Sequence, residues 1–128
     1  QPGRSQLVYL DPPFMSGGKY RFTQRVGEEG WRGDVRFQLR RDTYGDRWKG
    51  GLEAYRQALR PILIAARDRL TDTGALALHV DWRVSGAVRG LLDEVFGPDH
   101  FENEIIWAYQ SGGKSERRFA RKHDSIFL

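Results

Sequence analysis

The chain has 128 residues, of which 39% are hydrophobic and 30% charged, and its net charge is +4. These values are typical of one globular domain with a core, and they exclude an intrinsically disordered chain. The chain has no cysteine, which excludes disulfides, thiolate metal sites and a cysteine nucleophile. Because it contains no bilayer-length apolar run and no secretory leader, we expect a cytoplasmic protein without a membrane partner.

Four short apolar runs predict β-strands, and two longer segments predict helices. The strands are expected at residues 7–10, 75–80, 104–109 and 125–128. Continuous apolar runs of this kind suit strands that are covered on both faces. Apolar residues recur at helical spacing in residues 52–70 and 83–96, which predicts the two helices.

Proline and glycine residues mark the expected helix boundaries. Pro61 should kink the first helix or split it near Arg60, because proline lacks the backbone donor. The "TDTG" segment, 71–74, is a candidate end for this helix, and Gly97 with Pro98 should end the second.

The order of these elements predicts an α/β fold. Strands that alternate with helices indicate right-handed crossovers and a mainly parallel sheet. The last two strands have only a loop between them, so they should pair antiparallel. Residues 17–51, with eight glycines, fit either a lid-like binding excursion or a disordered insertion, because structureless loops of this length are uncommon in compact domains.

The segment "DPPF", residues 11–14, follows the first predicted strand directly. In an open α/β sheet, ligands bind beyond the carboxyl ends of the strands, where Asp81 should also emerge. Asp11 offers a charged acceptor, Pro12 a main-chain carbonyl, and Phe14 a ring that can stack on a flat heterocycle. Two acceptors could hold both hydrogens of an amino group and favour a more pyramidal nitrogen, whose lone pair is then free to attack.

The motif and its surroundings resemble a known enzyme family. "DPPF" after an apolar strand is similar to the catalytic motif of S-adenosylmethionine-dependent DNA amino-methyltransferases. The segments "YLDPPFMSGGKY", "GLEAYRQALRPIL", "TGALALHVDWRVSGAVRGLLDEVFGPDHFENEIIW" and "RKHDSIFL" resemble β-class adenine-N6 methyltransferases, including modification subunits of type III restriction systems. This likeness covers nearly the whole chain.

The resemblance implies a class I S-adenosylmethionine-dependent methyltransferase fold, which is Rossmann-like, and a target base flipped out of double-stranded DNA. It assigns catalytic roles to Asp11, Pro12, Pro13 and Phe14, with the adenine amine held by Asp11 and the Pro12 carbonyl. Asp11 would also take the departing proton. Asp11 and Asp81 are the expected contacts to the donor, S-adenosylmethionine. A homodimer, a restriction subunit, and a bacterial, archaeal or phage origin are family expectations.

Two departures from the family pattern stand out. Met15 occupies a position where the family commonly has asparagine. The family's glycine-rich cofactor loop and its accompanying strands have no counterpart in residues 1–128. We therefore interpret residues 1–128 as a single catalytic-half domain that carries four of seven expected strands.

Three alternatives stay open. Cytosine-N4 methylation uses the same chemistry, but serine is more usual there at the position of Asp11. Methylation of glutamine amides in proteins usually goes with asparagine at that position. A truncated fragment that only binds nucleic acid, or does nothing alone, is the alternative without catalysis.

The loop at residues 111–123 is strongly basic, with five cationic side chains and one acidic one from Lys114 to Lys122. Such a loop is either a solvated surface or a contact to DNA phosphates, and the resemblance favours DNA. The expected DNA-binding residues are Lys114, Arg117, Arg118, Arg121 and Lys122. His79 lies in an apolar strand and is interpreted as a core histidine. The spacing of the histidines predicts no metal site.

Overall fold

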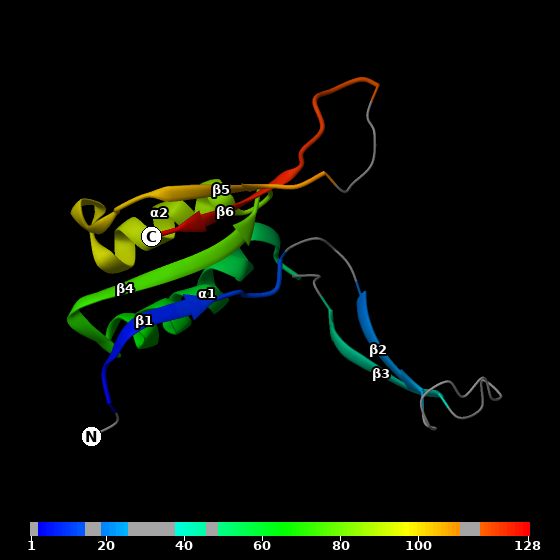
Figure 1. The fold of residues 1–128 in the computed structure, drawn as a ribbon, viewed down its shortest axis with the longest axis horizontal. Coiled ribbons are helices and arrows are strands. Elements are labelled where there is room, and N and C mark those ends of the chain that lie inside the picture. Colours follow the sequence, from blue (N-terminus) through cyan, green and yellow to red (C-terminus); the bar gives the residue numbers. More distant parts are fainter. Residues whose placement is uncertain (1–2, 15–18, 26–37, 46–48, 111–115) are drawn as a thin grey trace.

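The computed structural model describes residues 3–14, 19–25, 38–45, 49–110 and 116–128, with the backbone alone described in 19–25 and 38–45. Its centre is a four-stranded sheet in the order β1-β4-β6-β5 (Figure 1). The strands are β1 (Ser5–Leu10), β4 (Leu70–Asp81), β5 (Glu104–Ala108) and β6 (His123–Phe127).

The strand directions agree with an α/β fold. β1 pairs parallel with β4, while β6 pairs antiparallel with both β4 and β5. The antiparallel pairing predicted for the last two strands is therefore confirmed. β1, β4 and β5 run in one direction, but only β1 and β4 form a parallel pair because β6 lies between β4 and β5. The main sheet is therefore mixed, and the predicted mainly parallel pairing is wrong.

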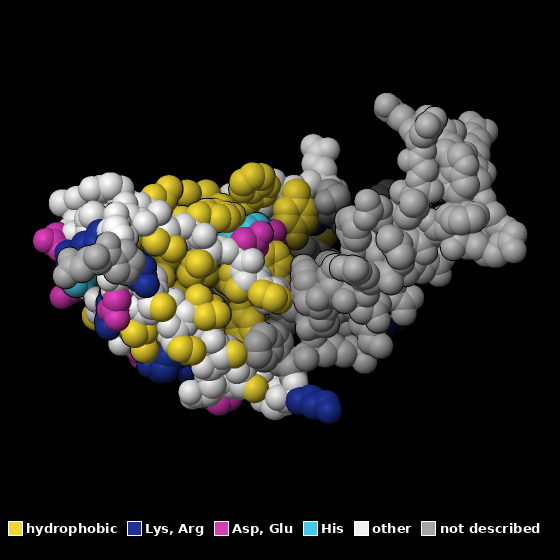
Figure 2. All heavy atoms as spheres, turned by 90° about the horizontal axis from the view of Figure 1, so that it is seen from below, with side chains coloured by type: hydrophobic (Ala, Val, Ile, Leu, Met, Phe, Trp, Pro, Cys, Tyr) yellow, Lys and Arg dark blue, Asp and Glu magenta, His cyan; other side chains and the backbone are white. Residues whose placement is uncertain are grey.

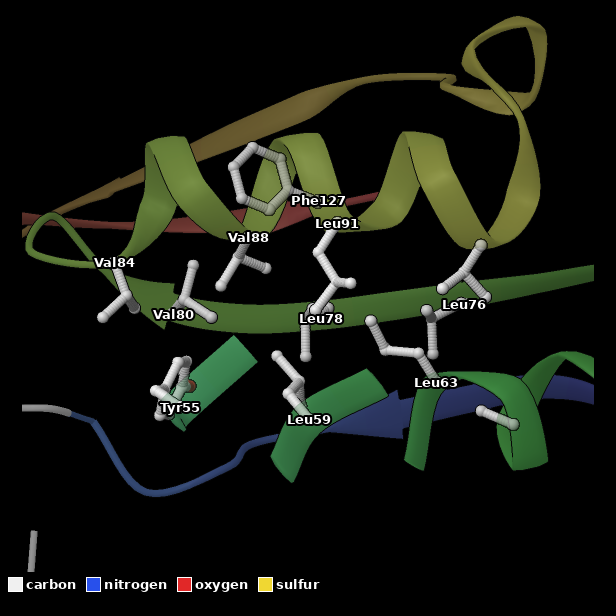
Figure 3. Packing of buried hydrophobic residues seen from close by; sticks show 12 residues of the cluster. Tyr55, Leu59, Leu63, Leu76, Leu78, Val80, Val84, Val88, Leu91 and Phe127 are labelled. Carbon is white, nitrogen blue, oxygen red and sulfur yellow. The ribbon is translucent and has the colours of Figure 1, made fainter. Parts of the chain in front are cut away.

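One face of the sheet is covered by the helices α1 (Gly51–Arg67) and α2 (Ser85–Phe96) (Figures 1 and 3). Alternate residues of β4 point to these helices, and Leu78 and Val80 are fully buried. Tyr55 of α1, Leu91 of α2 and Phe127 of β6 pack in the same cluster. This cluster is the core, and it forms because the apolar stripes of both helices face the even-numbered side chains of β4.

The opposite face of the sheet carries exposed apolar side chains. Leu7 and Tyr9 of β1 and Ile105 and Trp107 of β5 are all exposed. Figure 2 shows apolar side chains gathered over one side of the molecule, with a histidine and acidic side chains among them. None of the helices in the described ranges is long and apolar enough to cross a membrane.

The first helix differs from the sequence-based prediction. α1 is one uninterrupted helix through Pro61, so of the two predicted outcomes, a kink or a split near Arg60, the split is wrong. Pro61 and Gln57 are both exposed, so the carbonyl that loses its usual donor can bond water instead. α1 ends at Arg67, and the short helix η2 (Pro98–His100) follows α2, which ends before Gly97 as predicted.

The "TDTG" segment is part of β4 and not a helix end, so β4 is longer than predicted. The register between β1 and β4 shifts between Ser5 and Leu7, which marks an irregularity in the pairing. A Cβ atom at Gly74 would lie 2.8 Å from the Ser5 carbonyl oxygen. Glycine at this position therefore permits the close approach of the two strands.

The long excursion contains two strands that were not predicted. β2 (Lys19–Arg25) and β3 (Gln38–Gly45) pair antiparallel and lie apart from the main sheet (Figure 1). β2 was missed because its apolar residues, Tyr20 and Phe22, alternate with polar ones and form no continuous apolar run. That residues 17–51 act as a lid stays a prediction.

Replacing Leu78 by alanine should lower the free energy of unfolding by about 2–5 kcal/mol, because it leaves a cavity between the sheet and both helices. Denaturant unfolding of both forms measures this. Leu52→Ala, at an exposed position, is the control. If Leu78→Ala lowers the free energy of unfolding as little as Leu52→Ala does, the assigned core is contradicted.

An ion-pair cluster joins the two helices, where Arg56 and Arg60 both contact the Glu94 carboxylate. The hydrogen bond from Arg60 is the largest of the causes that lower the pKa of Glu94. A lowered carboxyl pKa stabilises the fold above the ordinary pKa, and this contribution is lost as the pH falls through the lowered value.

Glu94→Gln should therefore lower the melting temperature slightly near pH 7, and the difference from wild type should disappear in acid. Thermal unfolding across this pH range measures it. A difference that stays constant down to the acid end would show that charge is not the cause.

Candidate active site

The Asp-Pro-Pro-Phe segment begins where β1 ends, at the carboxyl edge of the sheet. Leu10 of β1 pairs with Leu78 of β4, so Asp11 lies beside His79. The Asp11 side chain is 56% exposed, and Phe14 is half-buried. The carboxylate is thus held at the edge of the fold and is open to a ligand.

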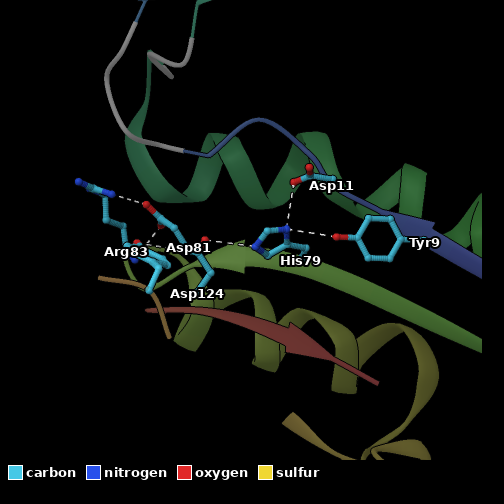
Figure 4. A network of polar contacts seen from close by, with 7 residues as sticks. Tyr9, Asp11, His79, Asp81, Arg83 and Asp124 are labelled. Carbon is cyan, nitrogen blue, oxygen red and sulfur yellow. Dashed lines mark hydrogen bonds and ion pairs between the residues drawn. The ribbon is translucent and has the colours of Figure 1, made fainter. Parts of the chain in front are cut away.

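His79 is the centre of a polar network that joins three strands or strand ends (Figure 4). Its Nδ1 atom lies 3.5 Å from Asp11 Oδ1 and 3.2 Å from the Tyr9 hydroxyl. Its Nε2 atom lies 3.2 Å from Asp124 Oδ2 on β6. The Tyr109 hydroxyl donates to the other Asp124 oxygen at 3.4 Å. Burial raises the pKa of Tyr109, and the Asp124 charge raises it further, so Tyr109 remains a donor at neutral pH.

Two aromatic rings contact the His79 imidazole. The Phe14 ring meets it edge to face at a centroid distance of 5.2 Å, and the Trp107 ring is stacked at 6.4 Å. Phe14 and Trp107 come from opposite ends of the sequence and from opposite sides of β4 in the sheet. The network therefore brings a carboxylate, an imidazole and flat apolar rings to one exposed edge.

Comparisons with known proteins show the family of this chain. A family model for DNA methylases, of the N6 and N4 type, matches residues 5–128. The chain belongs to the N6/N4 DNA methylase family. The resemblance to DNA amino-methyltransferases is thus confirmed at the level of this family.

Two relatives of this chain are much longer than it. It is similar to the type II methyltransferase M.EcaI of Enterobacter cloacae, with 31% identity over 124 residues that cover 96% of this chain and 24% of the relative. It is also similar to the type II methyltransferase M.KpnI of Klebsiella pneumoniae, with 27% identity over 130 residues that cover 99% of this chain and 27% of the relative. The chain therefore spans about a quarter of the length of these relatives.

Asp81 is engaged with its own chain. Its carboxylate accepts a hydrogen bond from the Arg83 backbone N–H at 2.8 Å and pairs with the Arg83 guanidinium. The residue is 4% exposed. Val84 is the N-cap of α2 and makes no side-chain cap bond, so Asp81 stabilises the preceding turn and does not cap the helix.

The basic loop between β5 and β6 is partly tied to the sheet. Both Arg83 and Arg121 place their guanidinium groups against the Trp82 ring, at 4.5 and 4.1 Å from its centroid. The Lys122 ammonium donates to the Gln110 carbonyl at 3.1 Å and closes the base of the loop. These contacts hold two of the five predicted DNA-binding residues close to the carboxyl end of β4.

Three other predicted DNA-binding positions lie further along the loop. Arg117 and Arg118 are exposed, and Lys114 lies outside the described residues. Phe119, between these arginines and Arg121, is 98% exposed. An aromatic ring without cover beside several cations is a surface suited to nucleic acid, because rings stack on bases and cations bind phosphates.

Sequence reasoning missed several residues of this site. His79 is not a core histidine as interpreted, because it alternates with the buried Leu78 and Val80 and so points to the other face of the sheet. That alternation was the available signal. No comparable signal marked Tyr9, Trp107 or Asp124, since their proximity to His79 follows from strand order. No group of three or more potential metal ligands is arranged for a metal within the described ranges.

Proposed function

We propose that the protein containing this chain is a site-specific DNA methyltransferase that transfers a methyl group from S-adenosylmethionine to N6 of a flipped adenine. The observation that carries the proposal is the exposed Asp11 carboxylate at the end of β1, followed directly by Pro12, Pro13 and Phe14. Family membership supports methyl transfer to DNA. The choice of adenine depends on aspartate as the first residue of the motif.

The chain's own residues hold the acceptor base in this proposal. The lone pair of an exocyclic amine is delocalised into the ring, which makes the nitrogen a poor nucleophile. Asp11 and the Pro12 carbonyl accept its two hydrogens and favour a pyramidal nitrogen, while Phe14 stacks on the base. Asp11 takes the proton once the nitrogen has become cationic. Pro13 restricts the loop that carries these groups.

S-adenosylmethionine supplies the electrophilic methyl group. The exposed Asp11 carboxylate suits a contact at the point where the methyl donor meets the target base. Asp81 fits poorly as a donor contact, because its buried carboxylate already binds Arg83. A cavity of about 460 Å³, lined by Leu70, Leu92 and Phe127 among others, lies at the amino-terminal end of β4, away from Asp11.

The sheet supports the class I, Rossmann-like assignment. β1, β4 and β5 share one direction with helical crossovers, and β6 is reversed. This is the pattern expected for four strands of the catalytic half. We accordingly place residues 1–128 as one catalytic-half domain of a longer enzyme that acts on double-stranded DNA in the cytoplasm. A homodimer and a restriction subunit stay predictions.

Cytosine N4 is the second candidate acceptor, because the family includes N4 as well as N6 methylases. Digestion of DNA treated with the complete protein, followed by mass spectrometry of the nucleosides, separates the two. N6-methyl-2′-deoxyadenosine is the expected product. N4-methyl-2′-deoxycytidine would make cytosine the substrate, and no methylated nucleoside would favour a protein that only binds DNA.

Asp11→Ala should reduce methyl transfer by the complete protein by about 100-fold or more, because it removes the charged acceptor for the amine. DNA binding should persist. The matched control is Asp72→Ala, which removes an exposed carboxylate at the other end of β4. Wild-type activity in Asp11→Ala would remove Asp11 from the mechanism.

Replacing Arg117 and Arg118 by alanine should weaken DNA binding and reduce the slope of log K against log salt by roughly 1.8, for two phosphate contacts. Fluorescence anisotropy at several salt concentrations measures this. Alanine at Arg4 and Arg69 removes the same charge at the opposite end of the sheet and serves as the control. An unchanged slope in the loop variant would exclude phosphate contacts by these two arginines.

A further inference from the structure

We propose that His79 is a positioning residue for Asp11 in the methyl-transfer reaction. This inference rests on the proposed function, in which Asp11 binds the target amine. In this account Asp11 contacts the substrate amine and His79 contacts Asp11. His79 acts by fixing where the Asp11 carboxylate lies.

The two ring nitrogens have different partners, and this difference defines the role. Asp124 is a carboxylate that only accepts hydrogen bonds when ionised, so Nε2 carries a proton and donates to it. With the ring proton on Nε2, Nδ1 accepts from the Tyr9 hydroxyl, which lies 3.2 Å away. The tautomer and the orientation of the ring are therefore set by Asp124 and Tyr9 together.

Nδ1 is also the atom nearest to Asp11, at 3.5 Å from Oδ1. This separation is too long for a strong hydrogen bond, so Asp11 keeps acceptor capacity for a substrate amine. When Asp11 takes a proton from the amine, its new O–H group can donate to Nδ1 in place of the Tyr9 hydroxyl, because Nδ1 has a single lone pair. The geometry thus allows one imidazole to face Asp11 before and after the proton moves.

Packing restricts the ring as well. The imidazole is 17% exposed and contacts both Phe14 and Trp107. Phe14 belongs to the same motif as Asp11, so a shift of His79 would disturb the stacking ring and the carboxylate together. Misplacement of reacting groups by about 1 Å can cost on the order of 100-fold in rate.

Two substitutions separate positioning from a purely structural link between β4 and β6. His79→Asn retains a polar atom near the position of Nδ1, beside Asp11 and Tyr9, and loses the bond to Asp124. His79→Gln reaches Asp124 from near the position of Nε2 and loses the group beside Asp11. The two variants therefore test the two sides of the ring.

The test uses the complete protein, S-adenosylmethionine and unmethylated genomic DNA, with kcat, KM for DNA and Tm measured for each form. His79→Gln should lower kcat about 10- to 100-fold with KM and Tm close to wild type. His79→Asn should keep more of kcat than His79→Gln despite a lower Tm. Tyr9→Phe, which keeps the ring and removes the hydroxyl, should lower kcat severalfold without changing Tm, and it decides the matter if His79→Gln does not fold.

Two outcomes would overturn the positioning role and leave the proposed function intact. One is a wild-type kcat in His79→Gln, and the other is a loss of kcat that follows the loss of Tm in both histidine variants. If His79→Gln does not fold, wild-type kcat in Tyr9→Phe would overturn it in the same way. A wild-type protein that transfers no methyl group would overturn both.

Discussion

Parallel pairing of β1 with β4 aligns the carboxyl ends of two strands that are separated by about sixty residues of sequence. With Leu10 opposite Leu78, the residues that follow β1 must lie beside the end of β4, and Asp11 meets His79. Asp11 and His79 are far apart in the sequence, and they meet only because β1 and β4 pair. The position of the Asp11 carboxylate therefore depends on the register of one strand pair, and Gly74 permits the close approach of these strands near Ser5.

β4 separates stability from chemistry by its alternation. Leu76, Leu78 and Val80 face the helices and form the core, whereas His79 faces the opposite side and contacts the site. Substitutions on the first face act on the free energy of unfolding. Substitutions on the second face act on the geometry around Asp11. Because the two faces belong to one strand, the packed core also fixes the positions of the site residues along β4.

Much of the fold could be predicted from the sequence, because apolar runs and helical periodicity marked all strands of the main sheet and both helices. The order of the strands in the sheet could not be predicted, since no local sequence feature places β6 between β4 and β5. The contacts of His79 with Asp124 and Trp107 depend on that order and were missed for the same reason. Prediction also failed where local signals were ambiguous, as at Pro61 and in the charged strands β2 and β3.

The central claim is that the edge beside Asp11 and Phe14 receives a flipped adenine. A crystal structure of the complete protein with DNA and an unreactive analogue of S-adenosylmethionine tests it most directly. The account predicts an extruded adenine whose amine nitrogen lies about 3 Å from both the Asp11 carboxylate and the Pro12 carbonyl, with Phe14 stacked on the ring. An extruded base bound elsewhere, or an Asp11 carboxylate turned away from it, would contradict the account.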